Sequence, residues 1–151
     1  MSSPSPRRLS WLVVLLIAVT GGFGWLLVRA QALPQGVVSV VWDKEACGQC
    51  RMHVGEPRFA SQIQTTRGKV LNFDDPGCLF QWLEANPAPA HAIYFHALEG
   101  DRWIPSDEVA FVETTPTPMG YGLGAVSKTS TSAISFQAAR ERIRAGKGRS
   151  H

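Results

Sequence analysis

The sequence is poor in cysteine and lacks a second pair of metal ligands. Only three of its 151 residues are cysteines. Beyond the Cys47–Cys50 pair there is no further Cys-x-x-Cys and no His-x-x-x-His. A structural zinc site needs four ligands, so the missing pair counts against zinc. Because three is an odd number, at least one thiol lies outside any disulfide, unless a metal holds all three.

The body of the chain also lacks an excess of positive charge. The formal net charge is +3, but the basic residues gather at the two ends of the sequence. Residues 34–139 carry seven basic and eleven acidic groups. Binding to nucleic acid needs a basic surface, which this composition does not provide. We therefore expect no nucleic-acid partner.

Near the N-terminus, charge is missing from a whole segment. Residues 9–28 lie between Arg8 and Arg29, contain no charged residue and carry Trp11 and Trp25 near their ends. At about 1.5 Å per helical residue this length crosses a bilayer. Basic residues are denser before the segment than after it, which places the N-terminus in the cytoplasm.

A second interpretation of this segment is a cleaved signal peptide, since Ala30-Gln31-Ala32 has the form of a cleavage site. Both interpretations export the rest of the chain. The absence of a cysteine near the end of the segment argues against a lipoprotein anchor. We predict a single-pass protein of the inner (cytoplasmic) membrane whose C-terminal domain lies in the periplasm or outside the cell.

This prediction divides the chain into five parts. They are a cytoplasmic N-terminus (1–8), a transmembrane anchor or signal peptide (9–28), a linker (29–36), a folded domain (37–145) and a basic tail (146–151). A domain of this length has room for one compact core.

The pattern of apolar residues within the domain predicts alternating strands and helices. Strands are expected over residues 59–66, 69–73 and 92–98, and residues 37–42 form either a further strand or the approach to the cysteine segment. Asp75 as N-cap and Pro76 at the first position predict a helix that ends at Asn86-Pro87.

A similar order of elements then begins again. Strands are expected over 109–113 and 123–127, followed by a helix over about 132–144 that Thr131 or Ser132 caps. The sequence therefore predicts an α+β domain of duplicated ββαβ units, in which the second unit lacks its final strand.

The segment Cys47-Gly48-Gln49-Cys50-Arg51-Met52-His53 concentrates two thiols, a thioether and an imidazole within seven positions. Soft donors of this kind suit Cu(I). A structural disulfide, a redox-active pair and a zinc site are the alternatives. A redox pair is expected to open a helix, which Gly55-Glu56-Pro57 prevents here. Covalent haem attachment needs histidine directly after the second cysteine, where Arg51 stands.

Two further positions bear on a metal site. Met119 lies in a loop rich in proline and glycine, over residues 114–124, where no periodic core face accounts for it. Cys78 lies on the apolar side of the first predicted helix, and we expect it to be a buried structural thiol. Asp74 and Asp75 are expected to cap that helix rather than act as acid or base.

In these blocks the sequence resembles the NosL family of copper accessory proteins of nitrous oxide reductase assembly. The matching blocks are Cys47-x-x-Cys50-x-Met52, Lys69 to Asp75 with Cys78-Leu79-Phe80 after it, and Pro118-Met119-Gly120. The resemblance implies a duplicated ββαβ fold and delivery of Cu(I) to a cuproenzyme. It also implies that Cys50, Met52 and Met119 are copper ligands.

The sequence departs from the family pattern at a few points. Arg51 replaces the usual glycine of the Cys-Gly-Met signature, and His53 stands where an aliphatic residue is common. The chain also ends before the last strand of the family.

Our hypothesis from the sequence is a membrane-anchored Cu(I) metallochaperone that is not an enzyme. The Cys50 thiolate is the strong donor, Met52 and Met119 are neutral thioethers, and Cys47 or His53 completes the site. The expected partners are the copper ion and a client cuproenzyme or copper-assembly protein. The alternative is a thiol–disulfide oxidoreductase that keeps the copper-site cysteines of a client reduced.

Overall fold

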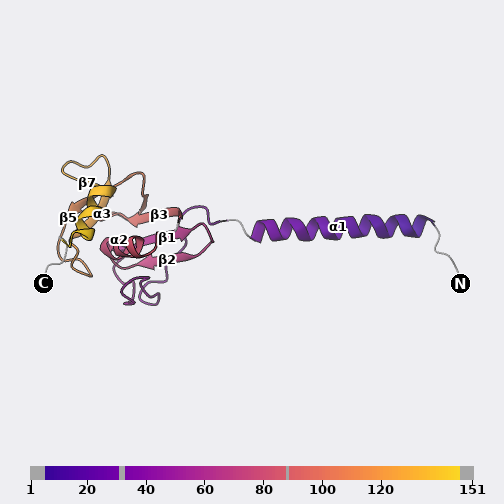
Figure 1. Ribbon diagram of the computed structural model, residues 1–151, viewed down its shortest axis with the longest axis horizontal. Coiled ribbons are helices and arrows are strands. Elements are labelled where there is room, and N and C mark those ends of the chain that lie inside the picture. Colours follow the sequence, from indigo (N-terminus) through magenta and orange to yellow (C-terminus); the bar gives the residue numbers. More distant parts are fainter. Residues whose placement is uncertain (1–5, 31–32, 88, 147–151) are drawn as a thin grey trace. The chain divides into compact units, whose positions relative to one another are not determined.

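The computed structural model describes residues 6–30, 33–87 and 89–146 (Figure 1). The chain divides into two compact units, Met1–Leu33 and Pro34–His151. Parts of the predicted N-terminus (1–8), linker (29–36) and basic tail (146–151) lie outside the described residues.

The N-terminal unit is a single helix, α1, over Pro6–Ala30 (Figure 1). Its described apolar side chains are exposed, among them Trp11, Phe23 and Trp25. Within the described part of the chain, no helix combines the length and the apolar character needed to cross a membrane. The predicted transmembrane helix over residues 9–28 is therefore not confirmed.

The second unit begins with a four-stranded antiparallel sheet and a helix. The elements of this first half are β1 (Ser61–Thr65), β2 (Val70–Phe73), α2 (Pro76–Ala85), β3 (Ala90–His96) and β4 (Trp103–Pro105). The strand order is β2-β1-β3-β4, so the first strand lies between its two successors. The predicted order of strand, strand, helix and strand is thus present, and β4 is an addition to it.

The structure shortens one expected strand and decides between the two alternatives for residues 37–42. The strand predicted from Phe59 begins at Ser61, because Pro57–Phe59 form a short 3-10 helix that opens with a proline. Residues 37–42 are not a strand. Instead, the side chain of Gln62 accepts from the Val38 N–H at 2.9 Å and donates to the Val38 carbonyl at 2.8 Å.

Helix α2 begins and ends where the sequence predicts. The Asp75 carboxylate accepts from the Gly77 N–H at 2.8 Å, and Pro76 occupies the first helical position, where a missing N–H costs no hydrogen bond. Asn86 closes the helix through its N–H to the Trp82 carbonyl. Most of the helix is buried, so it joins the core along its length.

The second half of this unit is a three-stranded antiparallel sheet and a helix. Its elements are β5 (Val109–Glu113), β6 (Leu123–Ser127), β7 (Ile134–Ser135) and α3 (Phe136–Arg144). The strand order is β6-β5-β7, so β5 lies between its two successors, as β1 does in the first sheet. The short strand β7 precedes the helix, whereas β3 follows its helix.

The last helix begins later than the sequence predicts. Ser132 has a φ of 67°, a left-handed conformation that cannot begin an α-helix. Residues 134–135 then pair with β5, and the Ser135 hydroxyl accepts from the Ala138 N–H at 3.2 Å. Ser135 is therefore the cap, in place of Thr131 or Ser132.

An aromatic cluster joins the two halves. Phe80 of α2 packs against Phe95 of β3, Phe111 of β5 and Phe136 of α3, with ring centroids 5.2–5.8 Å apart. The Leu98 N–H also donates to the Ala125 carbonyl at 2.8 Å, where the two sheets meet. The pairs of Phe80 with Phe111 and Phe136 are edge-on, and such pairs add to the energy of apolar burial. The prediction of one small α+β domain is confirmed.

Candidate metal centre

Residues 43–54, here called the cysteine loop, fold back on themselves. The Cys47 N–H donates to the Met52 carbonyl at 2.7 Å, and the Arg51 N–H donates to the Cys47 carbonyl at 3.2 Å. Outside this turn Ala46 pairs with His53. Arg51 has a φ of 67°, a conformation that favours glycine. Arg51 therefore adopts with strain a conformation that glycine adopts freely.

Contacts with β2 and its end hold the cysteine loop over the start of α2. The Gly48 N–H donates to the Asn72 carbonyl at 2.8 Å, and the Asn72 side chain donates to the Glu45 carboxylate. The Asn72 amide oxygen accepts in turn from Gln62 at 2.8 Å. Asp74 accepts from the Gly55 N–H at 2.9 Å, just after the loop. These bonds place the loop beside the first turn of the helix.

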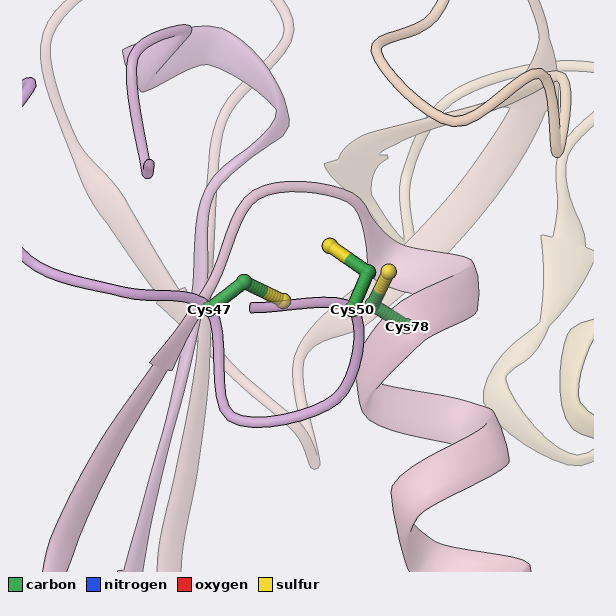
Figure 2. Close-up of side chains that lie close together, drawn as sticks. All are labelled: Cys47, Cys50 and Cys78. Carbon is green, nitrogen blue, oxygen red and sulfur yellow. The ribbon is translucent and has the colours of Figure 1, made fainter. Parts of the chain in front are cut away.

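Three thiols meet at this place. The Sγ atoms of Cys47, Cys50 and Cys78 lie within 4.8 Å of one another, and we call these residues the cysteine cluster (Figure 2). Cys47 and Cys50 come from the cysteine loop, and Cys78 comes from the first turn of α2. Cys47 and Cys78 are buried, while Cys50 is half-buried. All three are free thiols in the described chain.

The three thiols differ in their electrostatic surroundings. A hydrogen bond from the Cys78 thiol lowers the pKa of Cys47 to about 5, against the effect of burial and with help from backbone N–H groups, among them that of Asp74. The pKa of Cys78 is raised by the same hydrogen bond and by burial. Burial also raises the pKa of Cys50. At neutral pH the cluster therefore holds one thiolate, on Cys47, beside two thiols.

The cluster has the dimensions of a metal site. An ion about 2.3 Å from each sulfur, the length of a zinc–thiolate bond, holds three sulfurs about 4 Å apart. The observed separations, none above 4.8 Å, are close to this value. Within the described residues, no histidine or carboxylate joins the three sulfurs as a fourth member of the group. The donor set is three soft ligands, which suits Cu(I) better than tetrahedral zinc.

The loop that carries Met119 lies against the same helix. Residues 114–122 are here called the Met119 loop. The Met119 N–H donates to the Asp75 carboxylate at 3.2 Å. Two residues later the Tyr121 ring packs on Gly77, where an added Cβ would lie 2.1 Å from a ring carbon. Met119 is half-buried against the core, so a residue about seventy positions from the cysteine motif reaches the helix turn that carries Cys78.

The other two predicted ligands point away from the core. The side chain of Met52 is 55% exposed, and His53 is also exposed. Both residues contribute to the loop through backbone contacts. The Met52 carbonyl accepts from the Cys47 N–H, and His53 pairs with Ala46. Of the five predicted ligands, Cys47 and Cys50 thus lie in the cluster and Met119 lies beside the helix that completes it.

Cys78 was expected to be a structural thiol, and the structure adds a role that this expectation lacked. It is buried, but its sulfur lies with those of Cys47 and Cys50. A signal was present in the sequence, because Cys78 is the third residue of a well-capped helix that follows directly after a strand. A side chain there lies at the end of the sheet, where loops from elsewhere in the chain gather.

Comparisons with known proteins gave one structural match to report. No protein-family model matches the chain, and no curated protein matches it. The crystal structure of the copper chaperone NosL from Shewanella denitrificans is similar to it, with 18% sequence identity and a TM-score of 0.49. The match covers 75% of this chain and 89% of that one.

Proposed function

We propose that the Pro34–His151 unit binds one Cu(I) ion at the cysteine cluster and carries it to a client protein. The observation that supports this function best is the set of three free thiols within 4.8 Å of one another. Two of them are buried, so a bound ion is protected from water and oxidants. Cu(I) accepts a site of only three sulfur donors, whereas structural zinc requires a fourth ligand.

Transfer of the ion follows from the unequal burial of the cluster. Cys50 is its half-buried member, and the exposed thioether of Met52 lies two residues away. A sulfur ligand of a client therefore approaches on the Cys50 side. It binds the ion before the buried cysteines dissociate from the ion. By the resemblance of the sequence to the NosL family, we expect the client to be nitrous oxide reductase.

We also propose that the domain lies outside the cytoplasm. The support is the uncharged segment 9–28 after basic residues, because both sequence interpretations of it, an anchor or a cleaved signal peptide, imply export of the domain. We also infer that the two halves of the domain are copies of one unit. In each, the first strand lies between the two strands that follow it in the sequence, and the helix has a side-chain cap.

The alternative function, thiol–disulfide exchange, agrees less well with the geometry. An attacking thiol needs both a low pKa and access to its substrate. The low pKa belongs to Cys47, which is buried, and the accessible thiol, Cys50, has a raised pKa. The two requirements are thus divided between two residues.

Metal binding by the reduced, anaerobic protein tests the proposal. We expect one Cu(I) per chain in competition with a chromogenic Cu(I) chelator, and little zinc. Cys50→Ser should weaken Cu(I) binding by about a hundredfold, or roughly 2.8 kcal/mol, because it removes a ligand atom. Ser130→Ala, at an exposed position in a turn, is the control and should bind as the parent does.

Other outcomes would decide against a copper carrier. A one-to-one zinc complex that Cu(I) does not displace would contradict it. Turnover of a disulfide substrate without Cu(I) binding would favour the oxidoreductase instead.

A further inference from the structure

The Asp75 carboxylate has more partners than a helix cap needs. It is buried, and it accepts from the Gly77 N–H at 2.8 Å through one oxygen. Its other oxygen accepts from the Met119 N–H at 3.2 Å. The Thr117 hydroxyl is a further donor to this carboxylate. Only the first of these bonds belongs to the helix, because Thr117 and Met119 both lie in the Met119 loop.

The Met119 loop is organised around this carboxylate. The Thr117 hydroxyl oxygen accepts from the Gly122 N–H at 3.2 Å, and the Thr117 carbonyl accepts from the Gly120 N–H at 3.1 Å. The Asp75 carboxylate thus accepts hydrogen bonds from two residues of the Met119 loop, Thr117 and Met119. Thr117 in turn accepts the hydrogen bonds that close the turn of this loop.

The helix α3 shows what a cap alone looks like. There Ser135 accepts one hydrogen bond, from the Ala138 N–H, through its single side-chain oxygen. A second acceptor oxygen is available on Asp75 and not on a serine. That second oxygen is used for Met119, which lies 44 positions further along the chain.

The same helix turn carries a member of the cysteine cluster. Cys78 follows Asp75 by three residues, and its N–H donates to the Asp75 carbonyl at 3.0 Å. The side chain of Asp75 therefore fixes the backbone of Met119 relative to Cys78. The carboxylate is buried, so water does not compete for its bonds and each bond holds its partner firmly.

We propose that Asp75 is a positioning residue of the copper site, which holds the Met119 loop against the Cys78 turn so that the Met119 thioether reaches the bound Cu(I). This inference rests on the proposed function. It makes Met119 a ligand supplied by the second half of the domain, and it makes Asp75 the residue that couples that ligand to the cluster.

Asp75→Asn separates the two roles of the carboxylate. The amide oxygen of asparagine still accepts from the Gly77 N–H, since asparagine is as good an N-cap as aspartate. Its amide nitrogen then faces the Met119 N–H, and two donors cannot bond. The helix keeps its cap while the loop loses its acceptor. Asp107→Asn is the control, because it removes the same charge from an exposed position.

Cu(I) affinity is measured by chelator competition for the parent, Asp75→Asn, Met119→Leu and the double variant. We expect each single variant to bind Cu(I) about tenfold more weakly, and the double variant to bind no more weakly than Met119→Leu. Hydrogen exchange of the metal-free protein is the second measurement. The Met119 amide should exchange faster in Asp75→Asn, while the Gly77 amide stays protected.

The outcomes distinguish this inference from the proposed function. If the parent binds Cu(I) and Cys50→Ser weakens that binding by about a hundredfold, but Asp75→Asn binds like the parent, the inference is wrong and the copper function stands. Additive losses in the double variant would also overturn it, because they would mean that Asp75 acts without Met119. A parent that does not bind Cu(I) overturns both.

Discussion

The first turns of α2 and α3 have the same local design and very different surroundings. In each, a polar residue caps the helix and an apolar residue follows at the first position, namely Asp75 with Pro76 and Ser135 with Phe136. The third helical residue is Cys78 in α2 and Ala138 in α3. Cys78 is buried within the cysteine cluster, whereas Ala138 is exposed. The local sequence signals are similar, so they do not explain why only one turn carries a site.

The difference comes from what covers each turn. The cysteine loop and the Met119 loop both lie against the start of α2. Helix α2 buries most of its residues, while α3 buries only Ala139 and Ile143. A buried helix start excludes water and concentrates ligands from distant segments, and an exposed one does neither. The first half of the domain therefore holds the site, and the second half supplies a loop that closes it.

Gly77→Ala is the change expected to disrupt this difference most. The new Cβ would lie 2.1 Å from the Tyr121 ring, so the Met119 loop must move away from the helix. We expect a loss of about 3 kcal/mol in the free energy of unfolding, measured by urea denaturation. The corresponding residue of α3 is Gln137, which is exposed, and Gln137→Ala should change stability by about 0.5 kcal/mol or less. Equal effects at both positions would show that the two turns are not packed differently.

Cys78→Ala makes the third residue of α2 the same as that of α3. The thiolate of Cys47, with a pKa of about 5, should give an ultraviolet absorbance in the reduced, metal-free parent that is lost as the pH falls through about 5. The hydrogen bond from Cys78 is the largest cause of that low pKa. In Cys78→Ala the loss should therefore occur at a higher pH. An unchanged titration would mean that the backbone N–H groups around Cys47 suffice.

Arg51→Gly is expected to have the smallest effect. It tests the cysteine loop, which has no counterpart before the first strand of the second half. Only residues 106–108 separate β4 from β5, whereas the cysteine loop precedes β1. Glycine adopts the left-handed φ of position 51 without the steric cost that Arg51 bears. We expect a gain of about 0.5 kcal/mol, measured by thermal unfolding of the metal-free protein. Arg67→Gly, at an exposed position without a positive φ, should lower stability instead.

Several elements were predictable because their signals are local. The limits of α2 predicted from the sequence, Asp75 with Pro76 at its start and Asn86 at its end, are those of the structure. Capping depends on residues within one turn, so its signal is local. The start of α3 was predicted too early, at Ser132, because the same local signal was used. Serine is a good cap wherever the backbone allows it, but the pairing of residues 134–135 with β5 delays the start of the helix.

The segment 37–42 shows where apolar pattern alone is insufficient. Its valines and tryptophan suggest a strand, yet buried glutamines of β1 bind its backbone in place of a strand partner. The Gln62 side chain bonds the N–H and the carbonyl of Val38, and Gln64 bonds the Gly36 carbonyl. A polar side chain that substitutes for a neighbouring strand has no signature in the segment that it binds.

By itself, the sequence determined the α+β class, the limits of α2 and the concentration of soft ligands in residues 47–53, because each of these depends on residues close together in the chain. Only the tertiary structure decided that Cys78 joins Cys47 and Cys50, that the Met52 and His53 side chains are exposed, and that Met119 is held by Asp75. These outcomes depend on how a helix, a loop before β1 and a loop after β5 pack together. The energy that selects this packing is spread over the whole core, and no short stretch of the sequence contains it.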